Sequence, residues 1–86
     1  MEEIRFHNLS AYKAYVLAFL ANKISQADEK TRDLLSELIQ RTESLRSRDL
    51  HRFIARILRI QEQTKLDLST IIPTPEEVQQ IMQYPS

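Results

Sequence analysis

Four arginines recur at helical spacing in the middle of the chain, and they are the residues best suited to bind a ligand: Arg48, Arg52, Arg56 and Arg59. On a helix they fall within about 80° of one another. A guanidinium is a planar fork of donors that fits a carboxylate or a phosphate. Six of the twelve basic residues lie between Arg41 and Arg59, although the formal net charge of the chain is zero. We take the four arginines as the candidate partner-binding surface.

This surface has three interpretations. In the first, it is a solvated helix face whose arginines pair with acids such as Glu37, Glu43 and Glu62. Alternatively it docks an acidic protein partner, or it contacts nucleic acid. The neutral total charge and the lack of interleaved aromatic residues disfavour nucleic acid. Binding to phosphates would weaken steeply with salt, which separates the last two interpretations.

The other reactive residues do not indicate catalysis. His7 and His51 stand in different predicted elements, and no HExxH motif occurs. Because the chain has no Cys, a disulfide or a cysteine-based zinc site is excluded. The serines have structural explanations as caps or helix surface. We therefore predict no catalytic, cofactor-binding or metal site, and we expect the protein not to be an enzyme.

The chain has no Gly, and this count excludes several functions. A phosphate-binding P-loop, a dinucleotide GxGxxG turn and a GxSxG elbow all need Gly for positive φ or close approach. Tight β-hairpins rely on Gly as well. We predict an all-α fold: a small bundle of three main helices and a short C-terminal helix.

The length of 86 residues predicts one domain with a thin core. A chain of this size buries only about 60–65% of the surface it exposes when unfolded, so pairing with a second copy would help. The longest apolar run, Ala14–Ala21, is far shorter than the ~20 residues that span a bilayer. The acidic start, Met1-Glu2-Glu3, is unlike a secretory signal. We expect a cytoplasmic protein without a membrane partner.

Local signals divide the single domain, residues 1–86. Residues 1–8 are either an extended arm that docks Ile4 and Phe6 or a frayed end. A first helix should start near Asn8 or Ser10 and end near Asn22 or Ile24. Ser25 and Asp28 form a capping signature for a second helix, over about 26–45.

The remaining helix boundaries follow from the phase of the apolar stripes and from the positions of the prolines. The apolar stripes before and after Arg48 differ by about 100°, which predicts a turn or kink near Leu45–Asp49. The alternative is one long helix whose two halves face different neighbours. Ser47 or Asp49 would cap the third helix, which fades after about Leu66. A linker over 67–75 follows, and then a short helix over 75–84. Thr74, Pro75 and Glu77 predict a capping box at its start.

The first helix has two apolar faces. One carries Tyr12, Tyr15, Val16 and Phe19, and the other carries Ala11, Ala14, Ala18 and Ala21. Either this helix is central in a monomeric bundle, or its alanine face lets a second copy approach closely. Because so few residues can hardly surround a central helix, we predict a homodimer and take the alanines as self-association candidates.

Together these features predict a small non-enzymatic helical interaction or adaptor protein, homodimeric, whose partner the sequence does not name. An acidic protein is the favoured kind of partner. The alternative is a nucleic-acid-binding regulator that uses the arginine stripe on the third helix.

Overall fold

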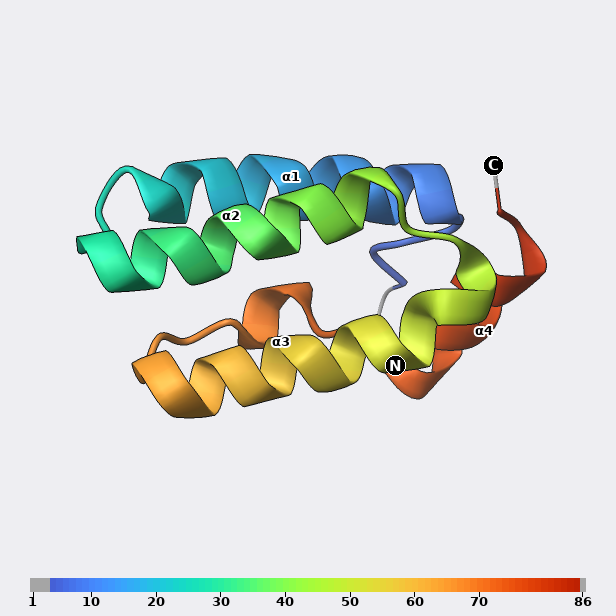
Figure 1. Ribbon diagram of the computed structural model, residues 1–86. Helices are drawn as coiled ribbons and strands as arrows, with labels where there is room; N and C mark the ends of the chain where they lie inside the picture. Colours follow the sequence, from blue (N-terminus) through green and yellow to red (C-terminus); the bar gives the residue numbers. More distant parts are fainter. Residues whose placement is uncertain (1–3, 86) are drawn as a thin grey trace.

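The computed structural model describes residues 4–85, and within them every regular element is helical. The helices are α1 (Leu9–Ile24), α2 (Glu29–Glu43), α3 (Leu50–Thr64) and α4 (Pro75–Gln83), with short 3-10 turns at Ser47–Asp49 and Ser69–Ile71. The first three run antiparallel in succession, and α4 lies across one end of the bundle (Figure 1). The all-α prediction is confirmed.

Polar caps set the start of the first two helices. The Asn8 side chain accepts a hydrogen bond from the backbone N–H of Ala11 at 2.7 Å, as its position predicted. The expectation that Ser25 opens the next helix is wrong. Ser25 instead ends α1 and donates back to the carbonyl of Asn22, while Asp28 caps α2 and accepts from Thr31. The chain reverses its direction over the residues between Ser25 and Asp28 (Figure 1).

The predicted break between α2 and α3 is confirmed. The helix α2 ends at Glu43, and Arg46 is extended, with φ −118° and ψ 155°. Asp49 stands directly before α3, yet its side chain makes no capping hydrogen bond. The reason is local: the 3-10 turn runs straight into α3, so Asp49 lacks the extended backbone that lets a cap side chain fold back.

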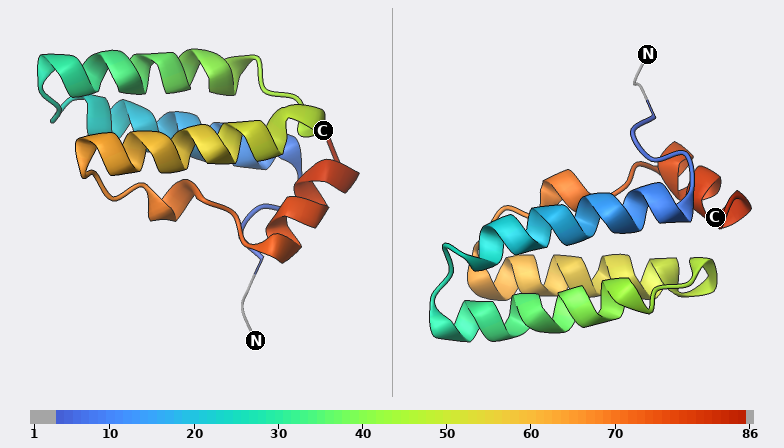
Figure 2. Two further views of the ribbon diagram at one scale, coloured as in Figure 1. Left: turned by 60° about the horizontal axis from the view of Figure 1, so that its bottom comes forward. Right: turned by 90° about the horizontal axis from the view of Figure 1, so that it is seen from above.

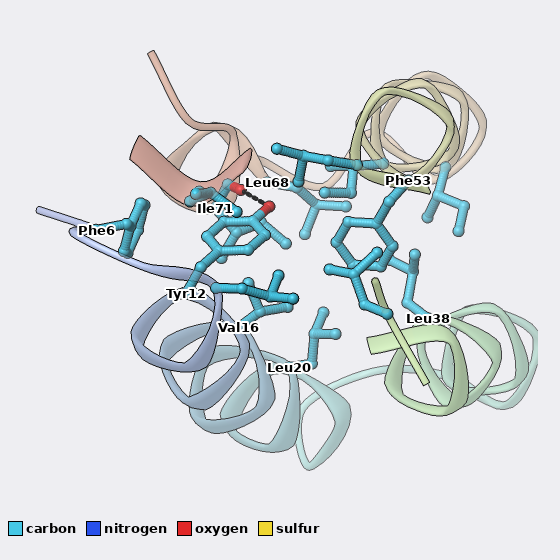
Figure 3. Packing of buried hydrophobic residues seen from close by; sticks show 14 of the residues in the cluster. Phe6, Tyr12, Val16, Leu20, Leu38, Phe53, Leu68 and Ile71 are labelled. Atoms are coloured by element: carbon cyan, nitrogen blue, oxygen red, sulfur yellow. Dashed lines mark hydrogen bonds between the residues drawn. The ribbon is translucent and has the colours of Figure 1, made fainter. Parts of the chain in front are cut away.

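The segment between α3 and α4, residues 65–74, runs back along the bundle and covers its open side. Lys65 ends α3 in the left-handed region, with φ 63°, a position that Gly usually takes. The Gln61 side chain then accepts from the backbone N–H of Leu68 at 2.7 Å. Leu68 and Ile71 are fully buried and point toward the residues of α1 and α3 (Figure 3). This return segment therefore contributes to the core as well as connecting two helices.

The core is one cluster that all of these elements share. It joins buried residues of α1, α2, α3, the return segment and α4 around Tyr12, Leu38, Ile57, Leu68 and Ile81. The radius of gyration is 12.5 Å. A compact chain of this length is expected near about 12 Å, so the single chain is compact without a second copy.

Residues near both ends of the chain meet at one end of the bundle, beside α4 (Figure 2). Glu77 has an exposed fraction of 1%, and its carboxylate accepts from the backbone N–H of Arg5 at 2.7 Å and from the Arg5 guanidinium at 3.1 Å. It also accepts from the N–H of Thr74, whose hydroxyl accepts from the N–H of Glu77. The predicted capping box is thus confirmed.

Aromatic contacts also stabilise the end of the bundle beside α4. Phe6 is buried and packs edge-on against Tyr12 and Tyr15, with ring centroids 4.9 and 5.1 Å away. The Tyr12 hydroxyl donates to the carbonyl of Ile71 at 2.6 Å, and burial raises the pKa of Tyr12. We call Arg5, Phe6, Tyr12 and Glu77 the terminal clamp. The first three residues of the predicted 1–8 arm lie outside the described residues, whereas Phe6 is docked.

Candidate functional site

Three of the candidate arginines lie on α3, on the side that faces away from the core. The opposite side of α3 buries Leu50, Phe53, Ile57 and Ile60, so Arg52, Arg56 and Arg59 face outward. Arg52 and Arg59 are exposed, and Arg56 is half-buried. Arg48 lies earlier, in the 3-10 turn, and is exposed.

An open groove of about 460 Å³ lies between the end of α2 and the first turns of α3. Arginines form much of its wall, and apolar atoms make up about as much of the exposed lining as polar atoms do. Its lining residues are Arg41, Ser44, Leu45, Asp49, Arg52, Phe53, Ala55, Arg56 and Arg59. We call this the arginine groove.

A glutamate beside the groove already binds two of its arginines. Glu37 of α2 accepts from Nη2 of Arg56 at 2.7 Å and from Nε of Arg41 at 3.1 Å. The hydrogen bond from Arg56, followed by that from Arg41, lowers the pKa of Glu37. The pair with Arg56 ties α2 to α3 across the groove, whereas the pair with Arg41 joins successive turns of α2.

The groove keeps an excess of positive charge after this pairing. Its four arginines face two acids, Asp49 in the lining and Glu37 beside it, so the balance is +2. Among the described residues, Arg52 and Arg59 make no ion pair. The guanidinium groups of these two arginines are therefore available to an anionic group. The Nε atom of Arg56 also has no hydrogen-bond partner within residues 4–85, but it is buried and an incoming group cannot reach it.

The structure brings together part of the predicted surface and adds one residue to it. Arg52, Arg56 and Arg59 share the groove, but Arg48 does not line it. Arg41 joins them from α2, and sequence reasoning missed its role. Its only local signal was the Glu37–Arg41 spacing of four. Of the acids expected to neutralise the stripe, Glu37 pairs with Arg56, while Glu43 and Glu62 form no ion pair within residues 4–85.

The two faces of α1 have different surroundings. Tyr12, Val16 and Leu20 are fully buried. The four alanines of the opposite face are exposed: Ala11, Ala14, Ala18 and Ala21. The single chain therefore covers one face of α1, and the outward face carries these alanines with Tyr15, whose exposed fraction is 40%. In this chain α1 is not a central helix surrounded on all sides.

Other kinds of site have little support in the part of the chain that the structure describes. His7 and His51 are both exposed, and no group of three His, Cys, Asp or Glu is placed to hold a metal ion. No helix within residues 4–85 is both long and apolar enough to cross a membrane.

Comparison with known proteins adds no assignment. No protein-family model, curated protein or solved structure matches the chain. Its function has to be argued from the geometry above.

Proposed function

We propose that the protein is a small non-enzymatic interaction module that forms a homodimer and binds an acidic protein partner through the arginine groove. The observation that carries this proposal is the charge of the groove: four arginines against two acids, in a chain whose total is zero. A positive patch attracts a negative one and sets which partners are rejected. The cytoplasm stays the predicted place of action.

The groove is better suited to an acidic polypeptide than to nucleic acid. Single-stranded nucleic acid is usually bound on exposed aromatic rings on which its bases stack. The aromatic residue in this groove is Phe53, whose exposed fraction is 4%, so it offers no stacking surface. Carboxylates need only the guanidinium donors, which the groove supplies.

Binding to polyglutamate and to a single-stranded oligonucleotide, each measured at two salt concentrations, tests the proposal. We expect polyglutamate to bind and the double variant Arg52→Glu, Arg59→Glu to abolish that binding. The control is Arg32→Glu with Lys30→Glu, which makes the same charge change on exposed residues of α2 outside the arginine groove. Preferential binding of the oligonucleotide, with a steep loss in salt, would replace this proposal by the nucleic-acid alternative.

Support for a homodimer comes from the outward face of α1. Its alanines allow a second helix to approach closely, and no Asp, Glu, Lys or Arg stands among them on that face. Light scattering on a sizing column should give a mass near twice 10.2 kDa. The larger side chain of Ala18→Leu should shift the mass to that of a monomer. Glu29→Leu, an exposed position of α2, is the control. A monomeric wild type would refute the dimer without affecting the groove.

A further inference from the structure

We propose that the arginine groove takes an acidic protein segment that also carries an apolar side chain, and that Glu37 occupies part of the site until this segment displaces it. This inference rests on the proposed function, since it specifies the partner of the same surface. It adds two statements: what the segment must contain, and which residue of this chain competes with it.

Glu37 shows how the groove holds a carboxylate. Its two oxygens are bound by arginines from two helices, Arg41 of α2 at 3.1 Å and Arg56 of α3 at 2.7 Å. The side chain of Glu37 is 35% exposed, so water and other anions can reach it. The pair with Arg41 is exposed and the pair with Arg56 is half-buried, and a partner's carboxylate that takes the place of Glu37 would keep the same hydrogen bonds.

The remaining donors provide for more than one carboxylate. Arg52 and Arg59 stand about two turns apart on α3 and make no ion pair among the described residues. Arg56 lies between them, and its Nη2 is held by Glu37. Spaced acidic residues on one segment match this row of donors.

The apolar part of the segment follows from the lining between the arginines. Leu45, Phe53 and Ala55 contribute to the groove beside Arg52 and Arg56. Leu45 and Phe53 have exposed fractions of 5% and 4%, so only their edges are open and the contact area is small. One aliphatic side chain between acidic neighbours would cover these edges. A free phosphate or a purely acidic chain would leave these apolar edges exposed to water.

Fluorescence anisotropy with labelled peptides tests the composition of the segment. The probes are a peptide that repeats Glu-Glu-Leu, an all-glutamate peptide of the same length and a peptide that repeats Lys-Lys-Leu. We expect the first to bind several-fold more tightly than the second, and the third not to bind. Equal affinity for the two acidic peptides would overturn the apolar requirement.

Three single substitutions test the place of binding. We expect Arg52→Glu and Arg59→Glu each to weaken binding of the Glu-Glu-Leu peptide by about tenfold. Arg48→Glu is the matched control, because it makes the same charge change on the same stripe but lies outside the groove. It should weaken binding by no more than about twofold. Far-ultraviolet circular dichroism checks that each variant is folded.

The competition by Glu37 predicts a gain of affinity. Glu37→Gln keeps the size of the side chain and removes its charge, which leaves Arg41 and Arg56 open to the peptide and raises the local balance from +2 to +3. We expect the Glu-Glu-Leu peptide to bind about threefold to tenfold more tightly. Unchanged or weaker binding would show that Glu37 is a structural residue and not a competitor.

The outcomes separate the two proposals. If Arg48→Glu weakens binding as much as Arg52→Glu does, the groove is wrong as the site, while a general acidic-partner function survives. If every arginine variant binds the peptides like the wild type, or if no acidic peptide binds, both proposals fail. An oligonucleotide that binds more tightly than the peptides, and loses affinity in Arg52→Glu, would assign the groove to nucleic acid.

Discussion

The terminal clamp and the arginine groove both place arginine against glutamate, yet their chemistry differs. In the clamp, Glu77 is buried and accepts hydrogen bonds from Arg5 and from the N–H of Thr74. The Arg5 guanidinium also donates to the carbonyls of Thr70 and Ile72, at 2.8 and 3.4 Å. In the groove, Glu37 is partly exposed and serves two arginines, while Arg52 and Arg59 make no ion pair among the described residues.

This contrast indicates what each arginine does. Arg5 connects segments 72 residues apart in the sequence, and all three of its guanidinium nitrogens donate within the chain, so its role is to stabilise the fold. The groove arginines outnumber their acidic neighbours and lie on a face that the core does not need. The clamp should therefore control stability and the groove should control binding. Four changes to the protein test this division, taken in decreasing order of their effect on stability.

Removal of the Phe6 ring should give the largest loss. Phe6 has an exposed fraction of 1% and packs against two tyrosine rings, so Phe6→Ala leaves a cavity at the clamp. We expect the free energy of unfolding in urea to fall by about 3–5 kcal/mol. Leu58→Ala, at a position that is 47% exposed, is the control and should cost under about 0.5 kcal/mol. Similar losses in both variants would show that the arm is not part of the core.

Acid should weaken the clamp through Glu77. Burial alone would raise the pKa of Glu77, but hydrogen bonds from Arg5 and Thr74 lower it from 4.5 to about 2. A lowered folded-state pKa means that the ionised carboxylate stabilises the fold above pH 4.5, and that this contribution disappears as the pH falls toward 2. The contribution is about 3 kcal/mol.

Urea unfolding between pH 6 and pH 2 measures this contribution. Glu77→Gln should be less stable than the wild type at pH 6, and the difference should vanish near pH 2. Glu37→Gln is the matched substitution in the groove, and it should differ little from the wild type at either end of the range, because Glu37 is partly exposed whereas Glu77 is buried. A difference between wild type and Glu77→Gln that stays constant with pH would refute the role of the charge.

Loss of the Tyr12 hydroxyl should have a smaller effect. Tyr12 is fully buried, and its hydroxyl joins α1 to the return segment at the carbonyl of Ile71 (Figure 3). Tyr12→Phe keeps the ring but leaves that carbonyl without its donor, which should cost about 1–2 kcal/mol. Tyr15→Phe removes a hydroxyl that makes no hydrogen bond within residues 4–85. Its melting temperature should therefore equal that of the wild type. Equal melting temperatures for the two variants would contradict this interpretation.

Neutralising Arg52, which makes no ion pair among the described residues, should slightly stabilise the protein. Arg52 stands one turn before Arg56, and like charges at this spacing destabilise a helix by about 0.2–0.5 kcal/mol. We expect Arg52→Gln to raise the free energy of unfolding by a similar amount. Arg41→Gln should lower it slightly, because Arg41 loses its pair with Glu37. A clear loss of stability in Arg52→Gln would assign that arginine to the fold rather than to binding.

Much of the fold could be read from short stretches of sequence. The caps at Asn8 and Thr74 were predictable because the side chain bonds the backbone within three residues. The break after α2 was predictable from the phase of the apolar stripes. The cap at Ser25 was predicted wrongly, since both Ser25 and Asp28 are suitable caps and only the path of the turn chooses between them.

The candidate site was predictable only in part. Arg52, Arg56 and Arg59 share one helix, so their common face follows from helical geometry alone. Arg41 lies on another helix, and Arg48 lies in a 3-10 turn, where the period of about 3.6 residues in α3 does not hold. Whether either residue belongs to the groove depends on how α2 packs against α3, which no local pattern encodes.

The amino-acid sequence alone predicts the helical class, most helix boundaries and the row of arginines on α3. These depend on side-chain type, on the absence of Gly and on interactions within about four residues. Tertiary packing, by contrast, brings Arg5 to Glu77, places Leu68 and Ile71 in the core and adds Arg41 to the groove. Each of these depends on residues from separate elements reaching one place, and that placement comes from the packing of the whole core.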